Sequence, residues 1–187
     1  MTSSPPSRPA VLRVLVPAAL LLATACGGQD DGADPAAYEQ VRGRDLCRAV
    51  GDAPVEELLV ESGAARFDER SGDVLVGGLD VSEGEVEGLP SCTWTATDAV
   101  VGVRVYAAEL GTGTGPDGTV TSEVEVGGEA ALEQQLGDGA ACVDFLPLGD
   151  DLWLAVDATL PTGEPCPLTR ALAAAAVDDV RGLAAGS

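Results

Sequence analysis

Cysteine is the residue type whose number and spacing in this chain allow the most specific chemistry. Cys47, Cys92, Cys142 and Cys166 lie in the main body of the sequence, and Cys26 stands apart near its start. Four thiols allow two disulfides in three connectivities, of which we predict Cys47–Cys92 together with Cys142–Cys166. Each bond would close a loop of a few tens of residues and stabilise the fold by about 3–4 kcal/mol.

Two other uses of these four cysteines have less support. A zinc site needs closely spaced ligands, and the sequence contains no C-x-x-C pair. A catalytic thiol needs a neighbouring base or cation, and no cluster of such residues accompanies any of the four. We therefore expect all four to be structural.

The fifth cysteine follows a segment that is typical of an export signal. Two arginines precede an apolar run over residues 14–25, which Pro17 interrupts and Cys26 ends. This run of about 12 residues is short for a membrane-spanning helix, which needs about 20. The small residues Thr24 and Ala25 directly before Cys26 resemble the bacterial lipobox. We predict that Cys26 carries acyl groups; a plain secretory signal and an uncleaved anchor are the alternatives.

The rest of the chain divides simply. We predict a signal peptide over residues 1–25, a flexible tether rich in Gly, Asp and Ala over 26–37, and one domain over 38–187. The domain is expected to be a monomer on the extracytoplasmic face of the plasma membrane, held there by its lipid.

Composition excludes several kinds of chemistry. The chain has no His, Lys, Asn or Ile, a bias that points to a GC-rich bacterial genome. Without His there is no imidazole base and none of the commonest zinc ligand, and without Lys there is no Schiff base. The formal net charge is −21, and loss of the two arginines in residues 1–25 would leave 8 Arg against 31 acids. Such a surface repels nucleic acid and anionic lipid headgroups.

The spacing of apolar residues predicts both strands and helices. Residues 91–97, 101–107, 141–146 and 152–158 alternate with a period of two, as in half-buried strands, with Trp153 and Ala155 opposite Leu152, Leu154 and Val156. Asp98–Ala99 is expected to be the turn between the first two strands. Residues 141–146 and 152–158 should form a hairpin.

Helices are expected at both ends of the domain. Residues 45–50 suggest a short turn, and Asp52 is expected to cap a helix that runs to about Glu61 and buries Val55, Leu58 and Leu59. A final helix opens near Pro165 with a core-facing stripe formed by Leu168, Leu172, Ala176, Val180 and Leu183. The fold class is therefore α+β, an antiparallel sheet with helices packed on it.

Several motifs allow a function but have a simpler structural explanation. The acids that alternate along Glu83–Glu87 and Glu123–Val126 are expected to face solvent, although paired carboxylates also carry out acid and base catalysis. Gly111–Gly118 lacks the Lys of a phosphate-binding loop, and no D-x-D-x-D-G calcium loop occurs. Trp94 is expected in the core rather than on a sugar-binding surface.

The order of these features is similar to a known family. Leu46-Cys47, then Cys92-Thr93-Trp94, then Gly128-Glu129-Ala130-Ala131, a hairpin and an Ala/Leu-rich last helix resemble actinobacterial lipoproteins with a domain of unknown function and a D-P-C/C-x-W signature. This chain has Asp-Leu-Cys where that family tends to have Asp-Pro-Cys. The resemblance covers about residues 38–184. It implies an antiparallel sheet with helices packed against it, a bond between the first two of the four cysteines, and no established catalytic residue.

Two classes of function remain. We expect a non-catalytic binding or accessory module, with an envelope protein or small ligand as partner and with no cofactor, metal or catalytic residue. The alternative is an envelope hydrolase that uses carboxylates alone on glycan or peptide, but no Asp-Thr-Gly or Asp-Ser-Gly triplet occurs and only six aromatic residues are present.

Overall fold

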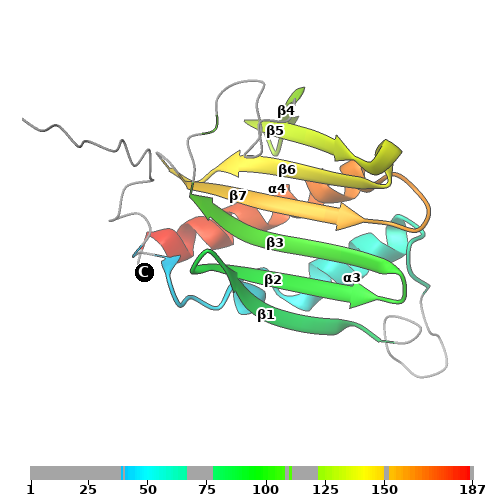
Figure 1. Ribbon diagram of the computed structural model, residues 1–187, viewed down its shortest axis with the longest axis horizontal. Coiled ribbons are helices and arrows are strands. Elements are labelled where there is room, and N and C mark those ends of the chain that lie inside the picture. Colours follow the sequence, from blue (N-terminus) through cyan, green and yellow to red (C-terminus); the bar gives the residue numbers. More distant parts are fainter. Residues whose placement is uncertain are drawn as a thin grey trace, which may run out of the picture. The chain divides into compact units, whose positions relative to one another are not determined.

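Seven antiparallel strands form one sheet in the order β1-β2-β3-β7-β6-β5-β4 (Figure 1). The computed structural model describes residues 39, 41–66, 78–107, 110, 122–149 and 152–185, which belong to one unit spanning Asp31–Ser187. Its strands are β1 (Asp80–Val86), β2 (Leu89–Ala96), β3 (Ala99–Ala107), β4 (Ser122–Val126), β5 (Glu129–Leu136), β6 (Ala141–Pro147) and β7 (Leu152–Thr159).

The predicted signal, Cys26, most of the tether and the Gly111–Gly118 loop lie outside the described residues. Within the described part, we find no helix with the length and apolar character that a membrane crossing requires.

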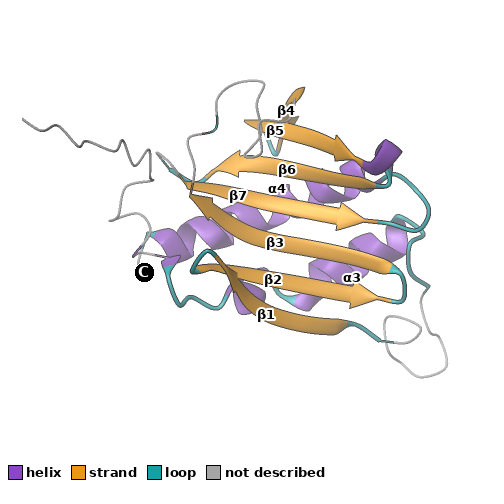
Figure 2. Ribbon diagram, in the orientation of Figure 1, coloured by secondary structure: helices purple, strands orange, loops and turns teal. Residues whose placement is uncertain are grey.

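The helices cover one face of this sheet. They are α2 (Leu46–Val50), α3 (Asp52–Glu61) and α4 (Pro165–Ala184), and all of them lie behind the strands in the view of Figure 2. α4 packs on β6 and β7, and α2 and α3 pack against α4. A one-turn helix, η1 (Gly137–Gly139), joins β5 to β6. The α+β arrangement with helices packed on an antiparallel sheet is the predicted one.

The core lies between the helices and the sheet face that they cover. On β2 the residues Cys92, Trp94 and Ala96 all point into it, and each is 1 % exposed or less. Alternate residues of the central strands β3 and β7, and the predicted stripe of α4, fill the rest. Leu183 of that stripe is only partly buried. Short aliphatic side chains thus make most of the contact, which lets α4 lie close to the strands.

Both predicted disulfides are present. Cys47 of α2 is bonded to Cys92 of β2, and Cys142 of β6 is bonded to Cys166 at the start of α4. Each bond ties a helix to the sheet, so the helical layer is attached covalently near both ends of the domain.

The structure corrects three details of the sequence analysis. Asp52 is the first residue of α3 and Gly51 is its N-cap, since Gly51 adopts φ 75°. The turn between β2 and β3 falls at Thr97 and Asp98, so that Ala99 already pairs with Ala96. β5 was not predicted, because its Ala, Glu, Gln and Leu residues lack the alternation of a half-buried strand.

Candidate functional site

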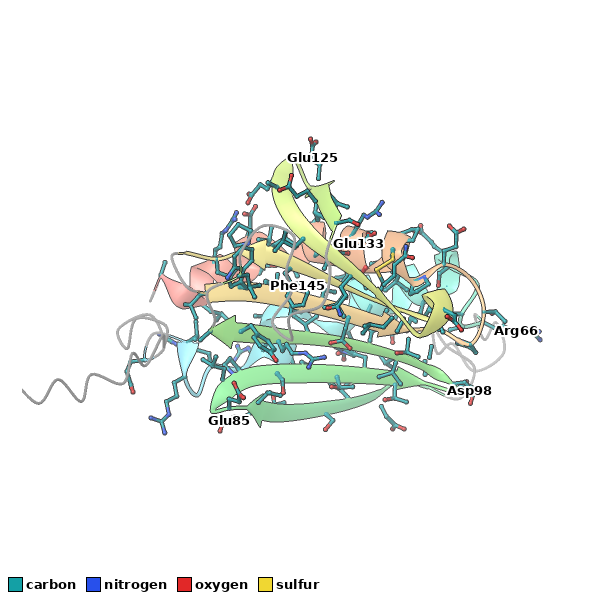
Figure 3. All side chains as sticks on the ribbon, turned by 45° about the horizontal axis from the view of Figure 1, so that its top comes forward. Arg66, Glu85, Asp98, Glu125, Glu133 and Phe145 are labelled. Carbon is teal, nitrogen blue, oxygen red and sulfur yellow. A yellow bond between two sulfur atoms is a disulfide. The ribbon has the colours of Figure 1, made fainter. Side chains whose placement is uncertain are left out.

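The sheet face that no helix covers is the candidate site. Strand register places Leu132, Phe145, Ala155 and Arg104 in one row across β5, β6, β7 and β3 on this face. Figure 3 shows Phe145 in front of the strands, on the side away from the helices. We call this surface the open face.

Aromatic residues gather on the open face. The structure describes four aromatic side chains, of which Trp94 lies in the main core. Tyr106, Phe145 and Trp153 instead form a second, smaller apolar cluster with Leu132 and Ala155. Trp153 pairs with Tyr106 in the β3–β7 register. A chain with few aromatics thus places most of its described ones outside the main core, which indicates a use other than filling that core.

A hollow of about 140 Å³ opens beside this cluster. Its apolar lining consists of Tyr106, Leu136, Val143, Phe145 and Ala155, and its polar lining consists of Arg104 and Gln134. Ala155 is the smallest of these side chains and lies between larger neighbours. At its rim, Leu136 is 41 % exposed, which is unusual for leucine in this domain. The hollow has room for a ring or side chain rather than a polymer.

An ion pair borders the hollow. The Nε atom of Arg104 donates to Oδ1 of Asp157 at 3.1 Å, and a second guanidinium nitrogen of Arg104 contacts the same oxygen. The pair crosses from β3 to β7 over Gly102, where a Cβ atom would lie 2.6 Å from Asp157 Oδ1. Glycine at this position therefore makes the room that the Asp157 carboxylate occupies.

The lining of the hollow consists of groups that are suited to binding. The hollow has aromatic and aliphatic walls, an amide and a neutralised guanidinium, and no carboxylate lines it. A hydrolase that uses carboxylates alone would need a pair of them, and the lining of this hollow contains none. Trp94, as predicted, is in the core: it is completely buried and its Nε1 atom donates to Asp52 Oδ1 at 2.8 Å.

Two carboxylates do meet under α4, on the covered face. Glu133 of β5 pairs in register with Asp144 of β6, and their side chains are 7 % and 0 % exposed. Arg170 of α4 donates from Nε to Glu133 at 2.7 Å. The Thr169 hydroxyl lies 2.6 Å from Asp144 Oδ2. Burial raises the pKa of Asp144 to about 6. The pair is therefore part of the buried contact between α4 and the sheet.

The same region contains the described group that comes closest to metal-site geometry. One oxygen of Glu133 and the sulfurs of Cys142 and Cys166 lie within 4.8 Å of one another. The two sulfurs are bonded to each other, and a disulfide lacks the thiolates that bind zinc. This geometry supports a structural role for the cysteines.

Two further acids, Asp45 and Glu83, lie close together at the β1 edge of the sheet. Asp45 accepts a hydrogen bond from the Arg48 backbone amide at 2.8 Å and so caps α2, while Glu83 of β1 lies beside it. A hydrogen bond with Asp45, together with charge repulsion from it, raises the pKa of the exposed Glu83 carboxyl. β1 is exposed along its whole length, as predicted for the acids of Glu83–Glu87. The contact is that of two solvated acids at a strand edge.

Sequence reasoning placed some of these residues but not their role. It assigned Trp153 and Ala155 to one side of a strand, yet it gave no means to decide which side the helices cover. It missed Asp144, although Asp144 lies two residues after Cys142 and therefore on the same strand face.

Comparison of this chain with protein-family models, with curated proteins and with solved structures found no match.

Proposed function

We propose that this protein is a non-catalytic binding module, held on the extracytoplasmic face of the membrane by acyl groups on Cys26, and that it binds its partner on the open face. The observation that carries the proposal is the hollow beside Tyr106 and Phe145 on a sheet whose helices are attached by two disulfides. Disulfides of this kind are typical of extracytoplasmic proteins. A stapled sheet keeps the hollow preformed, which lowers the entropic cost of binding.

The anchor and the family are part of the proposal. The small residues before Cys26 support lipid attachment, and the order of cysteines, tryptophan and last helix supports a relation to the actinobacterial lipoproteins of unknown function. A neutral hollow with one amide and one ion pair fits a small ligand or the side chain of an envelope protein. We therefore propose that the protein assists another component of the cell surface.

The two tryptophans provide a direct test of binding. A Trp94→Phe variant leaves Trp153, which belongs to the aromatic cluster on the open face, as the only indole in the chain. Soluble peptidoglycan fragments and short peptides serve as probes. We expect at least one probe class to shift the Trp153 emission in a saturable way, and Ala155→Leu, which fills the hollow, to abolish that shift.

The matched control is Thr95→Ala, on β2 of the same sheet and away from the hollow. Saturable binding that survives Ala155→Leu would place the site elsewhere and contradict the open-face assignment. The anchor is tested separately: Cys26→Ala should move the protein from the membrane fraction to the medium or periplasm, and retention in the membrane would contradict lipid attachment.

A further inference from the structure

Asp144 is the buried acid with the poorest hydrogen bonding among the described residues. Its side chain is 0 % exposed, and its Oδ1 atom has no hydrogen-bond partner. Its Oδ2 atom lies 2.6 Å from the Thr169 hydroxyl of α4. An ionised carboxylate presents two oxygens that both accept hydrogen bonds, and leaving one of them unpaired in the interior is costly.

The hydrogen bonds around Thr169 are better satisfied when the Asp144 carboxyl is protonated than when it is ionised. The Thr169 oxygen also lies 3.0 Å from the Cys166 carbonyl oxygen, so a single hydroxyl proton faces two acceptors. If Asp144 is neutral, its own proton goes to the Thr169 oxygen, and the Thr169 proton goes to Cys166. Both hydrogen bonds then form. With an ionised Asp144 only one of them can form.

The neighbouring charges do not favour the ion. The Asp144 side chain faces Glu133 on β5, the apolar Val156 on β7, and Thr169 and Arg170 on α4. Arg170 gives its hydrogen bonds to Glu133, so the nearest cation is already engaged. Glu133 adds a negative charge that opposes ionisation, and desolvation opposes it further.

We propose that Asp144 and Thr169 form an acid-strengthened latch between β6 and the first turns of α4, which holds the helix most firmly when the Asp144 carboxyl is protonated. Thr169 lies one helical turn beyond Cys166, whose disulfide keeps the start of α4 attached to Cys142. Loss of the proton therefore loosens the helix on the sheet without releasing it. This latch is independent of any ligand on the open face.

The latch makes stability depend on pH with a definite sign. In the unfolded chain Asp144 titrates near its usual value of 3.8, and in the folded protein its pKa is about 6. Below both values each state holds the proton, and the stabilisation is complete. As the pH rises, the unfolded state loses its proton first, so the free energy of unfolding falls until the pH exceeds 6. The unfolding equilibrium constant should rise about 100-fold over this interval from this group alone.

The test uses the whole chain with both disulfides intact. Carboxyl carbon NMR should show Asp144 titrating with a midpoint near 6 in the unaltered protein. Denaturant unfolding from pH 4 to 8 should show two differences. Asp144→Asn should be more stable than the wild type at pH 8. Between pH 4 and 7, its free energy of unfolding should fall much less than that of the wild type. A midpoint below 4.5, or an unchanged fall in the variant, would overturn the proposal.

Control variants separate the latch from other carboxyls. Asp179→Asn, an exposed change on the same helix, should leave the pH profile as it is. Thr169→Ser keeps the hydroxyl and should keep the Asp144 midpoint, whereas Thr169→Val removes the group that the protonated carboxyl binds best and should lower the midpoint. Hydrogen exchange of the α4 amides, corrected for intrinsic rates, should be faster at pH 7.5 than at pH 5. Equal protection of these amides at the two pH values would contradict the proposal.

Discussion

At the scale of single residues, Trp94 joins the sheet to the helical layer. Its ring is completely buried on β2, and its Nε1 atom reaches Asp52 at the start of α3, where it donates a hydrogen bond of 2.8 Å. The sequence suggested a core position for Trp94 and a capping role for Asp52. The first is confirmed, and the second is wrong because Gly51 occupies the N-cap. The Asp52 carboxylate instead accepts the hydrogen bond from the Trp94 indole.

The Trp94–Asp52 contact leads to a stability prediction. Asp52→Ala leaves the indole N–H without its acceptor, and we expect it to lower the free energy of unfolding by about 1–2 kcal/mol. Asp52→Asn retains an oxygen acceptor and should cost less than half as much. Denaturant unfolding at pH 7, followed by tryptophan fluorescence, measures both. Equal losses in the two variants would mean that the charge at the start of α3, rather than the hydrogen bond, matters.

At the scale of elements, the sequence predicted those segments whose pattern reflects one covered face. β2, β3, β6 and β7 alternate clearly, and α4 has a stripe of apolar residues every three or four positions. β5 is different, because Glu129–Leu136 is rich in good helix formers, and its pairing with β4 and β6 decides its conformation. Local pattern cannot reveal pairing between distant strands.

The same limit explains the candidate site. Periodicity assigns Ala155 and Phe145 to faces of their strands, but only the packing of α4 shows which face stays uncovered. The burial of Asp144 could have been predicted from the sequence, since Asp144 lies on the same face of β6 as Cys142. The contact between Asp144 and Thr169 could not have been predicted, because the two residues are 25 positions apart in the sequence.

The attachment of helices to the sheet yields a second prediction. Replacing Cys47 and Cys92 by Ala opens a bond with a separation of 45 residues, and replacing Cys142 and Cys166 opens one with a separation of 24. From the lost chain-entropy constraint we expect about 4 and about 3.5 kcal/mol of destabilisation, respectively. Non-reducing denaturant unfolding measures each pair. A loss below about 1 kcal/mol for either pair would contradict the structural role assigned to it.

α4 has a further attachment at its other end. Arg181 donates from Nη1 to Glu129 at 2.6 Å and from Nη2 to the Pro147 carbonyl at 2.9 Å. The contact with Arg181 lowers the pKa of the Glu129 carboxyl. The disulfide, the Asp144–Thr169 contact and this ion pair are spaced along the helix, so loosening at one of them leaves the others in place. In the proposed latch, this spacing would confine the effect of Asp144 protonation to the first turns of α4.

At the scale of the whole molecule, charge dominates. The chain has 31 acids and 10 arginines, so most carboxylates have no cation to pair with, and their repulsion opposes the compact state. In the described part, Arg104, Arg170 and Arg181 each pair with an acid of a sheet strand. The few cations thus hold the sheet and its helix together, while the remaining acids keep the surface hydrated.

Salt should therefore stabilise this protein. Raising NaCl from 0.01 to 0.15 M shortens the Debye length from about 30 to about 8 Å and screens the repulsion between surface acids. We expect a gain of about 1–2 kcal/mol, which is a rise of about 3–8 °C in Tm for a domain of this size. Calorimetry at pH 7 measures it. A fall in Tm with salt would mean that the arginine ion pairs outweigh the repulsion.

The same experiment with divalent ions separates screening from a specific site. A ligand that binds the folded state at a defined site raises Tm according to its own affinity. Because no D-x-D-x-D-G loop occurs in the chain, calcium and magnesium at matched ionic strength should raise Tm equally. Both should do so through counterion effects on the acidic surface. A larger rise with calcium, saturating at one ion per chain, would instead reveal an oxygen cage among the acids and change the expected ligand of this module from a small molecule to a cation.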